Sequence, residues 1–300
     1  MTPLFIGSGV ALVTPFDKDG KINTDLFEKL IEFQIANETD AVVVCGTTGE
    51  GSTLSVDERL DLFERSARVI NKRVPLICGT GSNSTSFTLE LAEKAEECGA
   101  DAHLMVTPYY NKTSQRGLVE HYFTLADKLS KPIIVYNVPT RTGMNIKPET
   151  YLELSKHPNI VGVKEADSNI SKLIKSIVLC GDNLDFYSGN DDLSSVACSL
   201  GCKGTISVLA NLMPKFNHDM IMSGLNGECE KCSSMQKDVA ELIEALFIDV
   251  NPIPVKYAMN QMGIEVGGCR LPLTDMNEHE KEFVDIALLP HREKIKAQNW

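Results

Sequence analysis

Lys164 is the residue whose type and position offer the most distinctive chemistry. It ends the apolar run Ile160–Val163, which places its amine at the carboxyl end of a buried strand. A free lysine has a pKa of about 10.4 and stays almost wholly protonated at pH 7, whereas burial lowers that pKa and frees a nucleophilic amine. The position indicates a lysine that captures a carbonyl group, with a solvated surface charge as the alternative.

Hydroxyl groups and one guanidinium lie in or near other loops that follow apolar runs. Tyr136, Tyr110 and Thr47 could carry protons, because a hydroxyl both donates and accepts, although a tyrosine that ends a strand is more often a packed ring. Arg141 lies in a turn with Pro and Gly, and its planar fork suits a carboxylate; a surface ion pair is the alternative. Of the competing lysines, Lys203 precedes an apolar run and belongs to the opposite face.

Glycine and cysteine patterns argue against a nucleotide cofactor and a metal. Gly46–Gly51 has the glycine spacing of a phosphate loop, but Ser52 stands where that loop requires a lysine. Gly79–Gly81 lacks the third glycine of a dinucleotide fingerprint, although backbone amides in both loops could receive a small carboxylate. We expect neither a cofactor nor a metal, because zinc would require two cysteine pairs to converge. These pairs are Cys198 with Cys202 and Cys229 with Cys232.

Eight short apolar runs, each followed by a polar loop, position these residues. Their alternation with amphipathic stretches requires parallel strands and right-handed crossovers. Eight units match a (β/α)8 barrel, the TIM barrel, in which the loops after the strands form the active face. A doubly wound open sheet is the alternative. The runs are Gly9–Thr14, Ala41–Val44, Val74–Cys78, Ala102–Val106, Pro132–Tyr136, Ile160–Lys164, Leu184–Ser188 and Gly204–Ser207.

Beyond the eighth run the chain changes character. Residues 213–300 predict helices interrupted at Gly224, Asn251–Pro252 and Gly267–Gly268, with Lys256 among them. We therefore expect a catalytic barrel over residues 1–212 and a C-terminal helical region over residues 213–300. That region would pack on the barrel or at a subunit interface.

Composition limits the partners and the compartment. Twenty-nine basic and 41 acidic residues give a net charge of -12, which disfavours nucleic acid and anionic membranes. The first residues lack a basic segment before their apolar run, and Thr14–Pro15 interrupts it, so neither a signal peptide nor a membrane span is predicted. Nine scattered cysteines favour a reducing compartment, and we expect a cytoplasmic protein.

Six motifs together, in this order and spacing, resemble the dihydrodipicolinate synthase family of pyruvate-dependent class I aldolases. The resemblance extends from about Gly9 to Pro272. The motifs are Gly46–Glu50 (GTTGE), Gly79–Gly81 (GTG), Thr107–Lys112 (TPYYNK), Tyr136–Gly143 (YNVPTRTG), Gly162–Ala166 (GVKEA) and Asn251–Lys256 (NPIPVK).

The resemblance implies a lyase that condenses pyruvate with L-aspartate 4-semialdehyde on the diaminopimelate route of lysine biosynthesis. Lys164 would form the Schiff base with pyruvate, with Tyr136 as its neighbouring acid and base and no other cofactor. Thr47 would link Tyr136 to Tyr110, which enters from the adjacent subunit. The family is expected to form a homotetramer of tight dimers.

The resemblance also assigns the residues that bind substrate. Thr48 would hold the pyruvate carboxylate, Gly189 and Ile206 would line the pocket, and Arg141 would orient the carboxylate of the second substrate. Other pyruvate-dependent aldolases, such as N-acetylneuraminate lyase and keto-deoxy sugar-acid aldolases, share the lysine, the tyrosine and the fold. The Arg-Thr-Gly ending of the Tyr136–Gly143 loop favours the synthase.

Two further alternatives and one regulatory departure remain. A non-catalytic barrel would not need the lysine. A phosphate-binding isomerase would need a glycine-rich loop after the last strands, and Ser188-Gly189-Asn190 has too few glycines for it.

Many bacterial relatives bind lysine as an inhibitor with histidines and an acid at positions that match Val56, Arg59 and Phe87. This chain keeps Asn83 and Tyr109 but has no carboxylate at Phe87, so we expect weak or absent inhibition by lysine.

Overall fold

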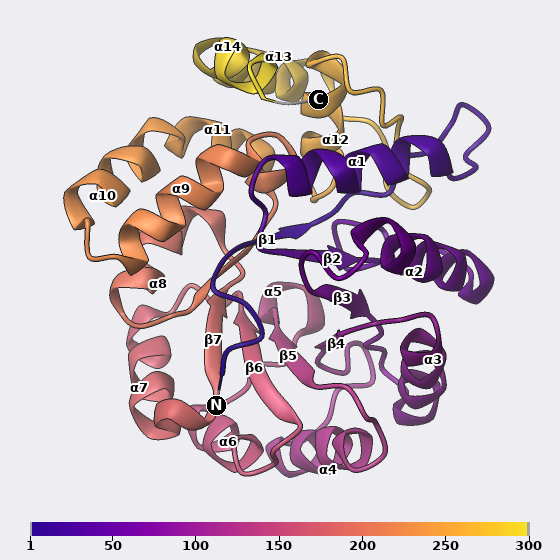
Figure 1. Cartoon of the computed structure of the whole chain (residues 1–300), viewed down its shortest axis with the longest axis vertical. Helices are drawn as coiled ribbons and strands as arrows, with labels where there is room; N and C mark the ends of the chain where they lie inside the picture. The colour runs from indigo at the N-terminus through magenta and orange to yellow at the C-terminus, as the bar shows by residue number, and fades with distance from the viewer. Residues whose placement is uncertain (1, 299–300) are drawn as a thin grey trace.

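Eight parallel strands form a closed barrel in the computed structural model, which describes residues 2–298 (Figure 1). They are β1 (Gly7–Ala11), β2 (Ala41–Val44), β3 (Leu76–Gly79), β4 (Ala102–Val106), β5 (Ile133–Asn137), β6 (Ile160–Glu165), β7 (Asp185–Ser188) and β8 (Gly204–Ser207). Each strand pairs with its neighbours in chain order, and β8 pairs with β1. The predicted (β/α)8 barrel is confirmed, and the open sheet is excluded.

Helices surround the strands and continue into the C-terminal region. Around the barrel they are α1 (Thr24–Ala36), α2 (Val56–Ile70), α3 (Thr85–Glu97), α4 (Gln115–Ala126), α5 (Pro139–Thr142), α6 (Pro148–Leu154), α7 (Ile170–Cys180) and α8 (Ser194–Ser199). The later helices are α9 (Pro214–Leu225), α10 (Cys229–Asp238), α11 (Ala240–Leu246), α12 (Ile253–Gln261), α13 (Glu278–Leu288) and α14 (Arg292–Lys296). The outer ends of the two expected regions, at Met1 and at Asn299–Trp300, lie outside the described residues.

Local sequence explains where several elements begin. Ser55 and Glu58 form the capping box that their spacing predicts at the start of α2, and Pro148 occupies the first turn of α6.

Two strands have other bounds than the apolar runs predict. The run from Gly9 to Thr14 leaves the barrel after Ala11, because the Val13 N–H donates to Asn211 Oδ1 at 3.1 Å. β3 begins at Leu76 because Pro75 has no N–H for the ladder.

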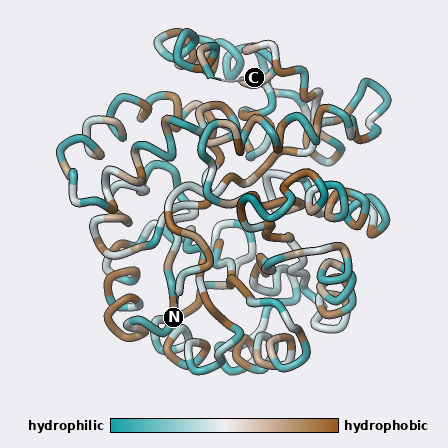
Figure 2. The backbone as a smooth tube through the Cα atoms, viewed as in Figure 1, coloured by the Kyte–Doolittle hydropathy of each residue, from teal (hydrophilic) through white to brown (hydrophobic). Residues whose placement is uncertain are grey.

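Apolar side chains fill both the barrel and the space around it. The interior cluster includes Val43, Ile77 and Ile206, and the strands at the centre of Figure 2 are correspondingly hydrophobic. A larger cluster joins barrel residues such as Val44 to Val284 of α13. The C-terminal helices therefore share a hydrophobic core with the barrel.

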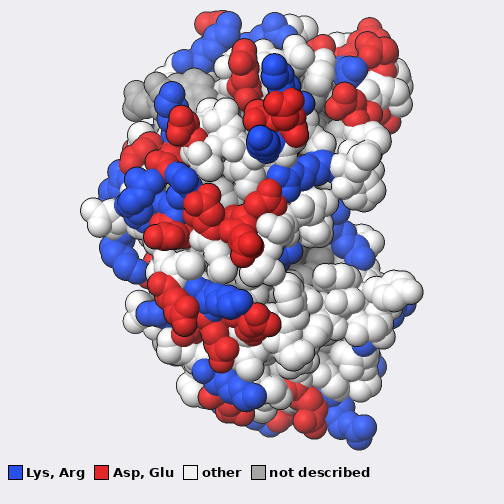
Figure 3. All heavy atoms as spheres, turned by 90° about the vertical axis from the view of Figure 1, so that its right-hand side faces the viewer, with Lys and Arg blue, Asp and Glu red and all other residues white. Residues whose placement is uncertain are grey.

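The outer face bears charges of both signs. Glu28 of α1 pairs with Arg65 and Arg68 of α2, and Glu32 pairs with Arg73, so acidic and basic side chains interleave there (Figure 3). Such exposed pairs contribute little each, because water and salt screen them. Within the part of the chain that the structure describes, no helix combines the length and apolar character needed to cross a bilayer.

Candidate active site

Lys164 lies near the end of β6, beside Tyr136 of β5 on one side and Tyr187 of β7 on the other. It is 5% exposed, and its Nζ lies 4.6 Å from the centroid of the Tyr136 ring. Burial lowers the pKa of Lys164 to about 8, an effect that Asp191 opposes and Arg141 reinforces. With such a pKa about a tenth of the side chains carry a neutral amine at pH 7, which makes Lys164 a nucleophile near neutral pH.

Tyr136 supplies a hydroxyl beside this amine. Its side chain is 7% exposed and is hydrogen-bonded to the hydroxyl of Thr47, which comes from the loop after β2. Burial raises the pKa of Tyr136, whereas Arg141 and Thr47 act in the opposite direction. The phenol therefore stays protonated at neutral pH, and the Tyr136 and Thr47 hydroxyls form a two-membered proton relay.

A cavity of about 240 Å³ opens beside Tyr136 and Thr47 at the carboxyl ends of the strands, and Lys164 lies behind Tyr136 rather than in the cavity lining. Side chains from loops, helices and a strand line the cavity, among them Thr47, Arg59 of α2, Tyr109, Tyr136 of β5 and Arg141 of α5. A larger and shallower groove lies between α1 and residues 263–265, but it touches none of the predicted site residues. The smaller cavity is the candidate site, because it brings hydroxyls and two guanidinium groups together.

Glycines form much of the wall of this cavity. A Cβ on Gly51 would lie 2.2 Å from the carbonyl oxygen of Cys45, and one on Gly79 would lie 2.4 Å from the same atom. A Cβ on Gly81 would lie 2.3 Å from the backbone nitrogen of Val106. The glycines of the GTTGE-Gly and GTG loops are therefore required by close backbone packing rather than by a phosphate group.

Thr48 and Arg141 both contact one residue of the C-terminal region. The hydroxyl of Thr48, a buried residue, accepts a hydrogen bond from Asn251 Nδ2 at 2.9 Å. Arg141, in α5, donates from Nη2 to the main-chain oxygen of Asn251 at 3.0 Å. The two residues expected to bind different carboxylates thus meet at Asn251, immediately before α12.

Gly189 lies close to the Lys164 side chain and Ile206 lies in the barrel interior, but neither of them lines the cavity itself. A Cβ on Gly189 would lie 3.2 Å from Lys164 Cε and 2.9 Å from Ala166 Cβ, so a larger side chain would press on the lysine. Ile206 of β8 is 1% exposed and belongs to the same interior cluster as Tyr136.

Tyr110 lies apart from the other predicted residues in this chain. Its side chain is 91% exposed, and its φ of 67° places it in the left-handed region that few non-glycine residues adopt. Its neighbour Tyr109 lines the cavity instead. A single chain therefore does not complete the expected arrangement of Tyr110, Thr47 and Tyr136.

Known proteins with similar sequences and structures support the same assignment. The model of the Dihydrodipicolinate synthetase family matches residues 4–289. A 4-hydroxy-tetrahydrodipicolinate synthase from Caldicellulosiruptor saccharolyticus is 50% identical over 294 residues, which cover 98% of this chain and 99% of that protein. The chain belongs to the dihydrodipicolinate synthetase family. The resemblance found in the six motifs is confirmed.

Solved structures of this family show the same fold. A chloride-inhibited dihydrodipicolinate synthase from Acinetobacter baumannii, in complex with pyruvate, has a TM-score of 0.93 and 40% identity, with 98% of this chain and 99% of that chain covered. A structure described as the first monomeric dihydrodipicolinate synthase variant also has a TM-score of 0.93, with 37% identity and 99% and 98% covered.

Sequence reasoning missed three residues around the site. Asp191 is 2% exposed, accepts from the N–H groups of Val208 and Leu209 at 2.9 Å each, and acts electrostatically on Lys164. Asn251 and Lys256 were noted only as parts of a motif and of a helical region. Asp191 could have been found because it follows the seventh apolar run by three residues. Asn251 and Lys256 could have been found because they begin and end a motif to which no role was assigned.

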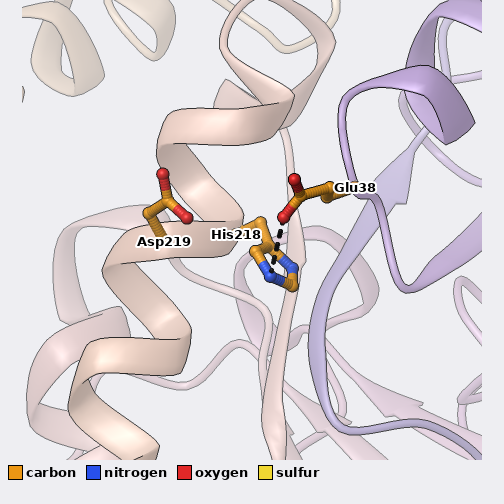
Figure 4. A group of neighbouring side chains, drawn as sticks. All are labelled: Glu38, His218 and Asp219. Atoms are coloured by element: carbon orange, nitrogen blue, oxygen red, sulfur yellow. Dashed lines mark ion pairs between the residues drawn. The ribbon is translucent and has the colours of Figure 1, made fainter.

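Among residues 2–298, one group of side chains has the spacing of metal ligands. It consists of Glu38, His218 and Asp219, and it lies on the opposite face from the cavity, since Glu38 precedes β2 (Figure 4). Lys215 pairs with Glu38 at 3.2 Å and with Asp219 at 2.5 Å, while His218 Nδ1 lies 2.8 Å from Asp40. These ion pairs explain why the three side chains lie close together.

Proposed function

We propose that this chain is a 4-hydroxy-tetrahydrodipicolinate synthase, which condenses pyruvate with L-aspartate 4-semialdehyde through a Schiff base on Lys164. The observation that carries the proposal is the buried amine at the end of β6, which has a lowered pKa and lies over the ring of Tyr136, whose hydroxyl interacts with Thr47. Relatives of this name are about half identical over nearly the whole chain. The reaction belongs to the diaminopimelate route to lysine.

The first step joins Lys164 to pyruvate. The neutral amine attacks the keto carbon, and the resulting carbinolamine loses water to give a protonated imine. Tyr136 donates a proton to the departing hydroxyl and recovers one through Thr47. No other cofactor is needed, because the imine is itself the electron sink.

The second step forms the carbon–carbon bond. Loss of a proton from the methyl group gives an enamine, whose carbon attacks the aldehyde of the semialdehyde while the aldehyde oxygen takes up a proton. Arg141 is suited to hold the carboxylate of that substrate through its planar fork. The amino group of the product then attacks the imine carbon, closes the ring and releases Lys164.

The pyruvate carboxylate needs hydrogen-bond donors of its own. Thr48 offers a hydroxyl that already accepts from Asn251, so its hydrogen is free for the carboxylate. Gly189 leaves space beside Lys164 Cε for the bound three-carbon unit, and Ile206 closes the apolar side. Holding both substrates here converts a bimolecular encounter into an intramolecular one.

Reductive trapping tests the proposed site directly. Incubation with pyruvate and sodium borohydride, followed by peptide mass mapping, is expected to place the adduct on Lys164. Lys203→Ala is the matched control and should still be labelled. An adduct on any other lysine would contradict the site. A coupled assay with L-aspartate 4-semialdehyde should detect turnover, whereas N-acetylneuraminate should give none.

We also propose that the complete site forms in a cytoplasmic homotetramer of tight dimers. The supporting observation is the 91% exposed side chain of Tyr110, which a second copy could cover. Sedimentation velocity should give a tetramer. Mixing Tyr110→Phe with Lys164→Met subunits should restore activity above that of either variant alone, because some sites then receive both native side chains. A fully active monomer would contradict this assembly.

A further inference from the structure

Asn251 connects the two substrate-binding regions of the proposed site. It lies in the C-terminal region, 203 residues along the chain from Thr48, yet its Nδ2 donates to the Thr48 hydroxyl at 2.9 Å. Its main-chain oxygen accepts from Arg141 at 3.0 Å, and the residue is 6% exposed. No role has been assigned to it in the reaction above.

The direction of the hydrogen bond to Thr48 decides what that hydroxyl can do. A threonine hydroxyl has one hydrogen and two acceptor positions. Because Asn251 Nδ2 fills an acceptor position, the hydrogen of Thr48 must point elsewhere and remains available to a carboxylate. An acceptor at position 251 would instead capture this hydrogen and turn it away from the ligand.

The remaining polar atom of the Asn251 side chain supports a functional reason for its placement. Among the described residues, Oδ1 of Asn251 is buried and has no hydrogen-bond partner. Asn260, in α12 of the same region, instead uses both side-chain atoms on Gly267, at 3.0 and 3.2 Å. A buried acceptor without a partner costs stability. Within residues 2–298, the only hydrogen bond of the Asn251 side chain goes to Thr48, so the role of this asparagine is to orient Thr48 rather than to stabilise the fold.

We propose that Asn251 is a positioning residue that orients the Thr48 hydroxyl to donate to the carboxylate of pyruvate. The inference rests on the proposed function and deepens it, because it assigns the recognition of the keto acid to a residue outside the barrel. The contact with Arg141 is made by the main chain and survives a change of side chain. Substitution of Asn251 should therefore weaken pyruvate binding and spare the second substrate.

Asn251→Asp tests the direction of this hydrogen bond, because it keeps the shape and leaves only acceptors. We expect KM for pyruvate to rise about tenfold or more, since a charge-assisted hydrogen bond is lost and a like charge is added. KM for L-aspartate 4-semialdehyde should change less than about twofold. At saturating pyruvate, borohydride should still trap the adduct on Lys164.

Three further variants keep the result interpretable. Asn251→Ala removes the donor without adding charge and should raise KM for pyruvate severalfold, which also provides the test if the aspartate variant does not fold. Asn251→Ala added to Thr48→Val should cost little beyond Thr48→Val alone, because the hydroxyl that Asn251 orients is already absent. Asn260→Ala should lower the melting temperature and leave both KM values unchanged.

Two results would overturn the inference. One is an unchanged KM for pyruvate in both Asn251 variants, and the other is an equal rise of both KM values. If the Lys164 adduct forms normally in such variants, the inference fails while the proposed function stands. If the unaltered protein forms no adduct with pyruvate, the proposed function itself fails.

Discussion

Two buried lysines, Lys164 in the barrel mouth and Lys256 in the C-terminal region, differ in what surrounds their amines. Lys256 is 1% exposed, and its Nζ donates to Thr14 O at 3.0 Å, to Glu50 Oε1 at 2.8 Å and to Gly268 O. Lys164 is nearly as buried, but within residues 2–298 its Nζ lies over the ring of Tyr136 and forms no hydrogen bond or ion pair.

The difference shows that burial alone does not make a lysine reactive. Burial lowers the pKa of both side chains, but the Glu50 carboxylate opposes the shift at Lys256 and three oxygen atoms take its three protons. Lys256 is thus held as an ammonium that joins the GTTGE loop to α12. Lys164 has no such set of acceptors and can release its proton.

The same substitution at both positions should give opposite results. Lys164→Met is expected to lower kcat by roughly three orders of magnitude or more, because no other amine can form the imine. Its melting temperature should stay level or rise, since an unpaired buried amine is replaced by an apolar chain of similar size. Steady-state kinetics and calorimetry measure both effects. Undiminished turnover would remove the basis of the mechanism.

Lys256→Met should act chiefly on stability. It leaves Glu50 buried without its partner, which costs about 3–5 kcal/mol of unfolding free energy. Urea titration of the variant should show this loss, and adding Glu50→Gln should recover part of it. A Lys256→Met protein as stable as the parent would show that the pair is not what holds α12 to the loop.

Tyr136→Phe tests whether the reactive lysine needs its neighbouring hydroxyl. We expect kcat to fall by about 10² to 10⁴, the range for loss of a general acid and base. Tyr122→Phe is a matched control, because the Tyr122 hydroxyl donates to Met105 O at 3.0 Å away from the cavity. That control should lose only a little stability and keep its kcat.

The pH dependence of imine formation should follow the amine of Lys164. Its pKa of about 8 means that the neutral fraction rises about tenfold per pH unit below pH 8 and levels off above it. The initial rate of pyruvate-dependent trapping by cyanoborohydride, measured from pH 6 to 9.5, should show this profile. A midpoint near the ordinary lysine value would mean that burial does not tune this amine.

The smallest expected effect is that of free lysine, which inhibits many bacterial relatives. The Lys256 ammonium has the Glu50 carboxylate as its partner. The cavity beside Tyr109 is instead lined by the Arg59 guanidinium, and position 87 holds a phenylalanine, so the ammonium of free lysine would lack such a partner. Millimolar lysine should leave the initial rate unchanged. Appreciable inhibition would show that other groups compensate for the missing carboxylate.

The sequence predicts this fold well because its signals are local. A four-residue apolar run such as Ala41–Val44 and the capping box at Ser55 act over a few residues, and both are found as predicted. The position of Lys164 follows from the same signal, because its run ends one strand. The end of β1 is less predictable, since Asn211, about 200 residues later, draws Val13 away from the sheet.

Asn251 and Lys256 show where the sequence stops being informative. Their partners Thr48 and Glu50 lie 203 and 206 residues away in the chain, and no periodicity reports contacts of that range. A lysine in a helix is expected to be solvated, so the buried pair with Glu50 was not predicted. Tyr110 is a different case, because its expected position depends on a second chain.

The glycine wall of the cavity limits how this protein can evolve. Around Cys45 the cavity is walled by peptide backbone, and any added side chain at Gly51 or Gly79 would collide with that backbone. Single substitutions there cannot produce a graded series of altered pockets. Changes in the cavity must instead arise at its side-chain positions, such as Ser52, Arg59, Tyr109 and Arg141, so that these can diversify while the backbone wall is inherited unchanged.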